Sequence, residues 1–245
     1  MPDTAPSANP MTIVTIPCLE DNYAFLLHDT QTGDTAVIDV PDAAPIKQAL
    51  ADHGWTLTHV LLTHHHWDHV DGLPDLLSTH PAKVIGATAD AHRLPPLDLA
   101  VAEGDTFSIG TNPVHVFDVS GHTLNHIAFH FPGSAALATA DSLMALGCGR
   151  LFEGTPAQMH DSLNKLAALP PETTVLSGHE YTESNARFAC SVDPHNPDLL
   201  MRVEAIRVAR AKGKPTVPSS LAEELATNPF LRCHTHGIQK TVGMI

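Results

Sequence analysis

Short runs of apolar or β-branched residues alternate with turn residues through about the first 180 positions of the chain. Gly, Pro, Asp or Asn bound most of these runs, a pattern that is typical of β-strands. Helical spacing falls between some of them, over 43–53 and 72–79. Strands interspersed with helices in this way predict a layered α/β or α+β domain. The predicted strands are 13–16, 24–27, 36–40, 59–62, 83–85, 114–119, 127–131, 135–138 and 174–176.

After about residue 180 the spacing of apolar positions becomes helical. Ser220 and Glu223 form a capping box, which predicts a short helix that ends before Asn228. A longer helix is predicted over 198–212, with three apolar residues and one arginine along a single face: Leu199, Val203, Ile206 and Arg210.

Thr155, Pro156 and Gln158 give a further helix start signal, because proline fits the first position of a helix. The helix predicted there covers 159–169. We therefore expect a flexible tail over 1–11, a domain of mixed strands and helices over 12–180 and a helical domain over 181–245.

The composition favours a globular cytoplasmic protein. With 245 residues and 43% hydrophobic content, the chain can bury a sizeable core. No apolar run reaches the length of a membrane span, and the start does not resemble a secretory signal. The four cysteines lack Cys-x-x-Cys spacing, so reduced thiols are expected rather than a disulfide framework. Oligomeric state leaves no signal in the sequence, and a monomer is compatible with it.

Charge is unevenly distributed along the chain. Residues 1–149 carry three basic and 17 acidic side chains, whereas residues 150–245 carry ten of each. The acidic first part would repel nucleic acid, which argues against a nuclease. An anionic small molecule would instead be met by side chains from the second part.

A compact cluster of metal-ligand residues follows the apolar run 59–62. His64 and His66 alternate in extended backbone, so both can point at one metal while His65 points elsewhere. Asp68 and His69 follow after the chain has turned, so they can face a neighbouring position. This arrangement favours two adjacent ions, for which imidazole and carboxylate are suitable ligands. A purification-tag-like tract would be terminal and would lack the interposed aspartate.

Three later residues qualify as further ligands, because one loop cannot complete two coordination spheres. His122 follows the strand 114–119, Asp141 follows the run 135–138, and His179 follows the strand 174–176. Each lies just past a predicted strand, where functional side chains of a layered α/β scaffold are commonly exposed.

This order of motifs resembles the metallo-β-lactamase superfamily. Within the superfamily, the chain looks like the glyoxalase II family, the hydroxyacylglutathione hydrolases, over about residues 12–232. The residues that carry this closer resemblance are the Thr-His-His-His-Trp-Asp-His stretch at 63–69, Asp21-Asn22-Tyr23, Gly147-Cys148-Gly149-Arg150, Gly178-His179-Glu180-Tyr181 and Asn228-Pro229-Phe230-Leu231-Arg232.

The resemblance implies an α+β fold, a four-layer αββα sandwich with a small C-terminal helical domain. By the same resemblance, residues 12–180 would form the catalytic domain and residues 181–245 would bind substrate. It also implies a centre of two divalent ions, zinc first, with iron or manganese as alternatives. His64, His66 and His122 would hold one ion. Asp68, His69 and His179 would hold the other, with Asp141 bridging both.

The implied reaction is hydrolysis of S-D-lactoylglutathione to glutathione and D-lactate, a step in methylglyoxal detoxification. A hydroxide between the two ions would attack the thioester carbonyl, with Asp68 taking a proton. The implied substrate contacts are Arg150, Phe152, Tyr181 and Arg232. All lie in the charge-balanced second part of the chain, as an anionic substrate requires. Cys148 is expected to be a packing residue in a tight turn.

Several positions depart from the commonest family residues. Asp71 and Asn125 occur where glycine is frequent. Ala140-Asp141-Ser142 occurs where Gly-Asp-Thr is usual. Phe152 replaces a tyrosine of some members, and Thr235 replaces a lysine. These last two changes bear on glutathione affinity and on selectivity among thioesters.

Other functions are compatible with parts of the pattern. A glutathione persulfide dioxygenase would use one iron and the three-histidine subset. Lactone or β-lactam hydrolysis would not require the later motifs. A metal-binding protein without turnover is a third class, which the complete ligand set argues against.

Overall fold

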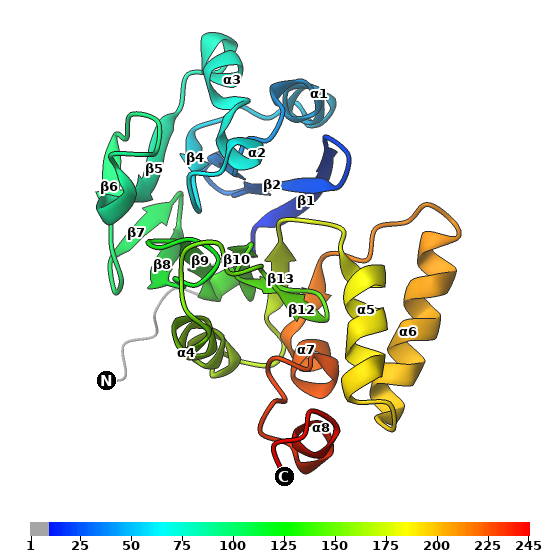
Figure 1. Cartoon of the computed structure of the whole chain (residues 1–245). Helices are drawn as coiled ribbons and strands as arrows, with labels where there is room; N and C mark the ends of the chain where they lie inside the picture. Colours follow the sequence, from blue (N-terminus) through cyan, green and yellow to red (C-terminus); the bar gives the residue numbers. More distant parts are fainter. Residues whose placement is uncertain (1–9) are drawn as a thin grey trace, which may run out of the picture. The chain divides into compact units, whose positions relative to one another are not determined.

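The computed structural model describes residues 10–245, which fall into two compact units (Figure 1). Unit 1 comprises the described residues up to Asp118 together with Asn125–Ala138, and unit 2 comprises Val119–Leu124 and Thr139–Ile245. The predicted tail lies outside the described residues over 1–9. Met11 is already buried, and its N–H donates to the Ser134 hydroxyl. The predicted domain boundary near residue 180 stays a prediction.

No helix among residues 10–245 is both long enough and apolar enough to cross a membrane.

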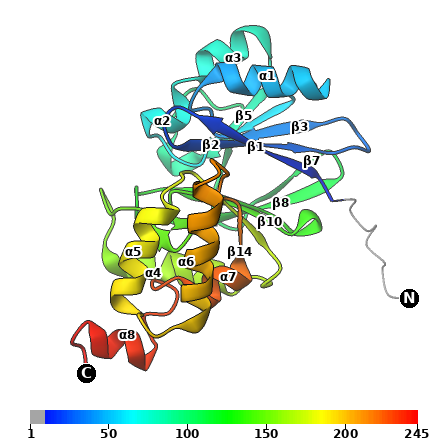
Figure 2. The same ribbon diagram turned by 90° about the vertical axis from the view of Figure 1, so that its right-hand side faces the viewer.

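Unit 1 contains a six-stranded sheet in the order β1-β2-β3-β4-β5-β6. The first three strands pair antiparallel and the last three join in parallel. Helices α1 and α3 lie along one side of this sheet in both views (Figures 1 and 2). The elements are β1 (Thr12–Cys18), β2 (Asn22–His28), β3 (Thr35–Ile38), α1 (Ala43–His53), β4 (His59–Leu61), α2 (Trp67–Val70), α3 (Leu73–Thr79), β5 (Lys83–Ala87), the 3-10 turn Thr88–Asp90 and β6 (Leu99–Val101).

Burial explains why the central strands form where they do. Phe25, Leu26 and Leu27 of β2 are buried, as is every residue of β3. Such continuous apolar runs are typical of strands covered on both faces. Helix α1 begins where Asp42 accepts a hydrogen bond from the Ala44 N–H and ends at Gly54, whose φ of 66° suits glycine.

Unit 1 also contains an antiparallel meander of strands β7 to β9 with the start of β10. Strand β7 pairs with β8, β8 with β9, and β9 with β10. The meander lies on the side of the first sheet away from α1 and α3 (Figure 2). Its elements are β7 (Thr106–Ile109), β8 (Asn112–Asp118), β9 (Ile127–Phe131), the 3-10 turn Pro132–Ser134 and β10 (Ala136–Ala140), whose last two residues belong to unit 2.

Unit 2 is mainly helical. Helices α5 and α6 pack side by side, and the core between them includes Ala186, Ala189, Leu199 and Ile206 (Figure 2). The elements are β11 (Leu143–Met144), β12 (Gly147–Cys148), α4 (Pro156–Ala167), β13 (Thr174–Ser177), α5 (Thr182–Val192), α6 (Pro197–Arg210), β14 (Ser219–Ser220), α7 (Leu221–Thr227) and α8 (His236–Thr241). Strand β11 pairs with β12, and β13 with β14.

The predicted capping box at Ser220 with Glu223 is confirmed. The predicted helix start at Thr155 is also confirmed, and it forms a second capping box with Gln158. The sequence pattern missed β6 and β7, which are only three and four residues long and have four exposed residues between them. It also missed the hairpin β11–β12, whose strands are only two residues long.

Candidate metal centre

In unit 1, the predicted ligand loop follows β4. His66 is the last extended residue before α2, so the chain turns between His66 and Asp68 as predicted. His64 and His69 are fully buried. The ring centroid of His64 lies 4.2 Å from that of His69 and 4.8 Å from that of His66. The loop therefore gathers three imidazoles within a few ångströms.

Asp39 supports this loop from β3, and the sequence pattern did not identify it. Its carboxylate Oδ2 lies 2.8 Å from the His69 Nδ1, and it accepts the Thr63 hydroxyl at 2.8 Å. The Thr63 N–H donates to its other oxygen. Candidate ligand atoms of Asp39, His64 and His69 lie within 4.8 Å of one another. A lone aspartate at the end of an apolar run was the only available signal.

Asn22 holds the predicted catalytic Asp68. Its side-chain Nδ2 donates to the backbone carbonyl of Asp68 at 3.0 Å and to Oδ2 of its carboxylate at 3.2 Å. That same Oδ2 lies 3.9 Å from the Nε2 of His69. The Asp-Asn-Tyr motif near the start therefore has a physical role, because it orients a carboxylate next to the His69 imidazole.

Two further histidines pack around the loop. His126 is fully buried, and its ring stacks on His64 with centroids 4.6 Å apart. His65 points to the buried Asp90, with its Nδ1 3.0 Å from the carboxylate. His65 thus joins a structural ion pair that also includes Arg93.

In unit 2, the other three predicted ligands converge on one carboxylate. The Nε2 atoms of His122 and His179 lie 3.4 Å and 3.3 Å from the same Oδ2 of Asp141. Two atoms bound to one zinc at about 2.0–2.1 Å and a tetrahedral angle lie about 3.3–3.4 Å apart. The observed spacing therefore fits donors that share a metal ion.

The backbone around Asp141 is closely packed. Gly178, next to His179, donates its N–H to the carbonyl of Ala140 at 3.0 Å. Gly149 passes so near that a Cβ there would lie 1.8 Å from the carbonyl oxygen of Asp141. Only glycine fits at this position, which explains its place in the Gly-Cys-Gly motif.

The hydrogen bonds at Nδ1 fit a metal centre. The Nδ1 of His122 lies 2.7 Å from the Arg150 carbonyl, so it must donate. The Nδ1 of His69 likewise donates to Asp39. The Nδ1 of His64 lies 2.9 Å from the Thr63 hydroxyl, whose proton goes to Asp39. In this tautomer each Nε2 carries the lone pair that a metal needs. The His and Asp cluster therefore indicates metal binding.

The predicted substrate residues lie next to these ligands in unit 2. The Phe152 ring lies 5.3 Å from the His122 ring, and the Arg150 guanidinium lies 5.5 Å above Phe152. Tyr181 stacks on His179 with centroids 4.7 Å apart. Arg150, Phe152 and Tyr181 are all exposed, so they can meet a ligand from solvent.

Arg232 and Thr235 lie in the segment between α7 and α8. The Nε of Arg232 is 3.2 Å from the Asp193 carboxylate, an ion pair that orients the guanidinium. Thr235 precedes α8, and its buried hydroxyl has no hydrogen-bond partner within residues 10–245. It does not supply the cation that a lysine would.

An apolar cavity of about 600 Å³ lies in unit 2 next to Arg150. Its walls include Met159 and Leu163 of α4 together with Phe188 and Phe230, whose rings stack at 5.6 Å. This lining offers no carboxylate, and it includes the Arg150 guanidinium and the His160 imidazole.

Backbone angles bear on three of the departures from the family pattern. Asn125 has φ of 65°, and asparagine tolerates this left-handed conformation better than most residues other than glycine. Ala140 has φ of 40°, where alanine is strained and glycine would not be. Asp71 has φ of −65°, so no glycine is needed there.

Cys148 lies in a β-strand paired with Leu143, rather than in the tight turn that the sequence predicted. Burial raises the pKa of its thiol to about 12, and burial likewise raises the pKa of Cys18 to about 11. Thiols with such pKa values are protonated at neutral pH, so neither serves as a nucleophile. All four cysteines are free, as expected.

Two family models match the chain. The metallo-beta-lactamase superfamily model matches residues 21–179, and the model of the hydroxyacylglutathione hydrolase C-terminus matches residues 180–245. The chain is 72% identical to a hydroxyacylglutathione hydrolase from Jannaschia sp. (strain CCS1) over 90% of this chain and 86% of that protein.

Solved structures show the same fold. The BLEG-1 B3 metallo-beta-lactamase matches with a TM-score of 0.69 and 22% identity, over 90% of this chain and 99% of that one. The di-iron-bound form of TTHA1623 matches with a TM-score of 0.59 and 27% identity, over 69% of this chain and 91% of that one. The expected metallo-β-lactamase fold, with a helical C-terminal region, is confirmed.

Proposed function

The chain belongs to the hydroxyacylglutathione hydrolases of the metallo-β-lactamase superfamily, and we propose that it hydrolyses S-D-lactoylglutathione to glutathione and D-lactate. The observation that carries this proposal is the approach of His122 and His179 to one oxygen of Asp141. A carboxylate between two imidazoles is suited to bridge a pair of ions.

The proposed centre uses the ligand set that the family resemblance implies. His64, His66 and His122 would hold one ion, and Asp68, His69 and His179 the other, with Asp141 shared. The Nδ1 hydrogen bonds of His64, His69 and His122 support this assignment, because they leave the Nε2 of these three residues able to bind metal. Zinc is the first expectation, and the ligand set also tolerates iron and manganese. When bound, such ions supply an activated water at neutral pH and positive charge for the oxyanion.

Asp68 is the proposed proton acceptor for the attacking water. Its carboxylate is oriented by Asn22, which donates to both the backbone carbonyl and the side chain of Asp68. A base held in a fixed orientation loses little entropy when the water approaches. Asn22 thus keeps the accepting oxygen directed toward the ligand loop.

The glutathione part of the substrate carries carboxylates and amides. Arg150 and Arg232 are the proposed cations for the carboxylates, and Tyr181 offers a phenolic hydroxyl. The Phe152 ring supports the Arg150 guanidinium through a cation–π contact. Phe152 lacks the hydroxyl of a tyrosine and Thr235 lacks the charge of a lysine, so we expect weaker glutathione affinity than in relatives that have both.

The proposed setting is methylglyoxal detoxification in the cytoplasm, with the chain working as a monomer on a small-molecule substrate. The acidic first part of the chain argues against nucleic acid as a partner.

The test is thiol release from S-D-lactoylglutathione by the metal-loaded protein. We expect release of one thiol per thioester, and S-D-lactoyl-N-acetylcysteine, which lacks most of glutathione, should be cleaved with a much higher KM. Oxygen uptake on glutathione persulfide in place of thioester cleavage would replace the proposal with a dioxygenase. Cleavage of a lactone or a β-lactam without thioester cleavage would replace it with another hydrolase of this fold.

A further inference from the structure

The hairpin β11–β12 connects two residues of the proposed site. Asp141 precedes it and Arg150 follows it, so its position sets where both side chains lie. Its turn includes Leu146, which has the left-handed φ of 57°. A non-glycine residue keeps such a conformation only when surrounding contacts hold it.

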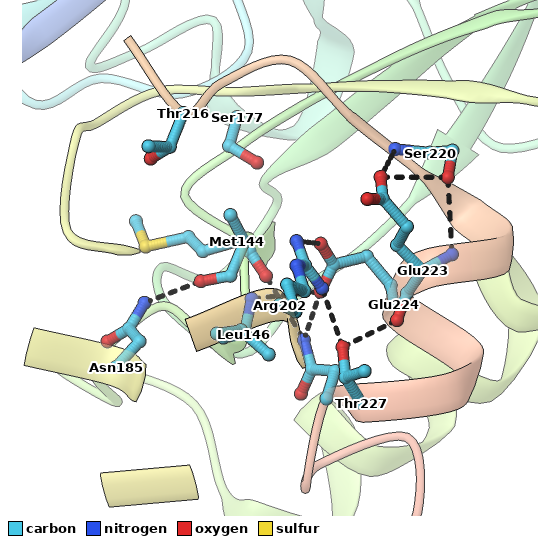
Figure 3. Close-up of polar contacts among 12 residues, drawn as sticks. Met144, Leu146, Ser177, Asn185, Arg202, Thr216, Ser220, Glu223, Glu224 and Thr227 are labelled. Atoms are coloured by element: carbon cyan, nitrogen blue, oxygen red, sulfur yellow. Dashed lines mark hydrogen bonds and ion pairs between the residues drawn. The ribbon is translucent and has the colours of Figure 1, made fainter. Parts of the chain in front are cut away.

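A buried polar network supplies those contacts from α7 (Figure 3). Glu224 is fully buried, and its Oε2 accepts the Leu146 N–H at 2.9 Å. Its other carboxylate oxygen pairs with Arg202 of α6, which also donates to Thr227. The carboxylate is thereby compensated, as a buried charge must be. Asn185 of α5 adds a hydrogen bond to the Ala145 carbonyl.

Asn228 connects this network both to the hairpin and to the turn that follows α7. Its side-chain Nδ2 lies within hydrogen-bond distance of the Met144 carbonyl at 3.1 Å, the Gly147 carbonyl at 2.9 Å and the Glu224 Oε2 at 3.0 Å. It therefore holds both strands of the hairpin. In the sequence, Met144 lies 84 positions before Asn228 and Gly147 lies 81 positions before it.

The other end of the same amide shapes the segment that carries Arg232. The Oδ1 of Asn228 accepts the Phe230 N–H at 3.0 Å, and the backbone carbonyl of Asn228 accepts the Leu231 N–H at 3.2 Å. The Arg232 N–H then donates to the Pro229 carbonyl. This turn places the Arg232 side chain next to Asp193, with which it forms an ion pair.

We propose that Asn228 is a positioning residue for substrate binding, because one amide fixes both the hairpin that carries Arg150 and the turn that carries Arg232. This inference rests on the proposed function, in which both arginines meet the carboxylates of glutathione. Two cations held at a fixed separation bind a dianion better than two cations that move independently, since less entropy is lost on binding. Asn228 itself touches neither substrate nor metal in this proposal.

A double-mutant cycle separates positioning from mere stabilisation. We expect Asn228→Ala to raise the KM for S-D-lactoylglutathione roughly tenfold, within the usual range of coupling between linked residues, and to change kcat less than about threefold. In an Arg232→Ala background the same change should raise KM less than about threefold. An equal effect in both backgrounds, or an unchanged KM, would overturn the proposal.

The matched control is Asn112→Ala. Asn112 is also a fully buried asparagine that donates to another side chain, Asp29, but it lies in unit 1 on β8. We expect it to lower the melting temperature without changing KM. If it raises KM as much as Asn228→Ala does, the effect is one of stability and the proposal fails.

A second variant covers the case in which Asn228→Ala does not fold. In Asn228→Ser the hydroxyl can still accept the Phe230 N–H but does not reach the hairpin. We expect a smaller rise in KM than in the alanine variant. This rise should again be smaller in the Arg232→Ala background. Binding of free glutathione to the metal-loaded variants, measured by calorimetry, should weaken in the same order. This binding is measurable without turnover, so failure of thioester hydrolysis and failure of the positioning role are distinguishable.

Discussion

The Nδ1 of His69 lies 2.8 Å from the carboxylate of Asp39, at the end of a strand 30 positions earlier in the chain. Both groups are buried. The contact fixes the His69 ring and directs its Nε2 away from Asp39. A carboxylate in this position also raises the basicity of the imidazole, which strengthens it as a metal ligand.

Asp39→Asn should therefore weaken metal binding. The amide keeps the size of the carboxylate but removes its charge, and the expected loss is about 10- to 100-fold in metal affinity. Competition with a chromogenic chelator measures the affinity. Asp29→Asn is the matched control, since Asp29 is an equally buried carboxylate of unit 1 outside the ligand loop. Equal losses in the two variants would contradict the role of Asp39.

Arg150→Ala should raise the KM for S-D-lactoylglutathione by about tenfold, because a charge-assisted contact to a carboxylate is lost. The effect should shrink at high ionic strength, since Arg150 is exposed. Arg207 is an exposed arginine paired with Glu204 on α6, outside the site, and Arg207→Ala should leave KM unchanged. A KM for Arg150→Ala that matches the wild-type protein would remove this residue from the substrate site.

Ala140→Gly should stabilise the fold by about 1 kcal/mol, because it relieves the left-handed strain at φ of 40°. A gain of this size raises the melting temperature by about 2–4 °C for a domain of this length. Ala138→Gly in the same strand is the control. Ala138 is not in the left-handed region, so the change should instead destabilise by about 1 kcal/mol. If both variants shifted the melting temperature in the same direction, the left-handed strain at Ala140 would not be the cause.

Asp29 should make folding stability depend on pH between about 4 and 2. Burial by itself raises the pKa of this carboxyl, but hydrogen bonds from the N–H groups of Thr111, Gln31 and Thr32 and from the Thr111 hydroxyl outweigh it and lower the pKa to about 2. The ionised form is thus favoured in the folded state. Its contribution is fully present above the unfolded pKa near 3.8 and is lost as pH falls through 2.

Urea unfolding of the wild type and of Asp29→Asn at pH 5, 4 and 3 tests this linkage. The difference in unfolding free energy between the two proteins should narrow by an amount on the order of 1 kcal/mol over this range and should continue to narrow below it. A constant difference across the range would show that the Asp29 pKa is not depressed.

The proposed ligands left clearer signals in the sequence than did the contacts that hold them. His64, His66, Asp68 and His69 stand close together behind an apolar strand, so their spacing alone predicted a metal-binding loop. The later ligands also follow strands, which made them recognisable as a set.

The supporting residues left weaker signals, because their partners are distant in sequence. Asn22 contacts Asp68 across 46 positions, and Asn228 contacts Gly147 across 81. A single asparagine does not indicate which distant carbonyl it meets. The sequence likewise did not reveal the backbone conformation at Ala140 and Asn125, which stood out only as residues unusual for the family. Their positive φ angles explain why glycine is frequent at these positions.

The most direct test of the central claim is a metal titration of the metal-free protein, with bound ions and S-D-lactoylglutathione hydrolysis measured on the same samples. We predict that activity rises with bound zinc and reaches its maximum at about two ions per chain. Asp141→Asn, with its fold checked by circular dichroism, should lose both the second ion and most of the activity. Full hydrolysis by the metal-free protein, or full activity in Asp141→Asn, would contradict the proposed two-metal thioester hydrolase.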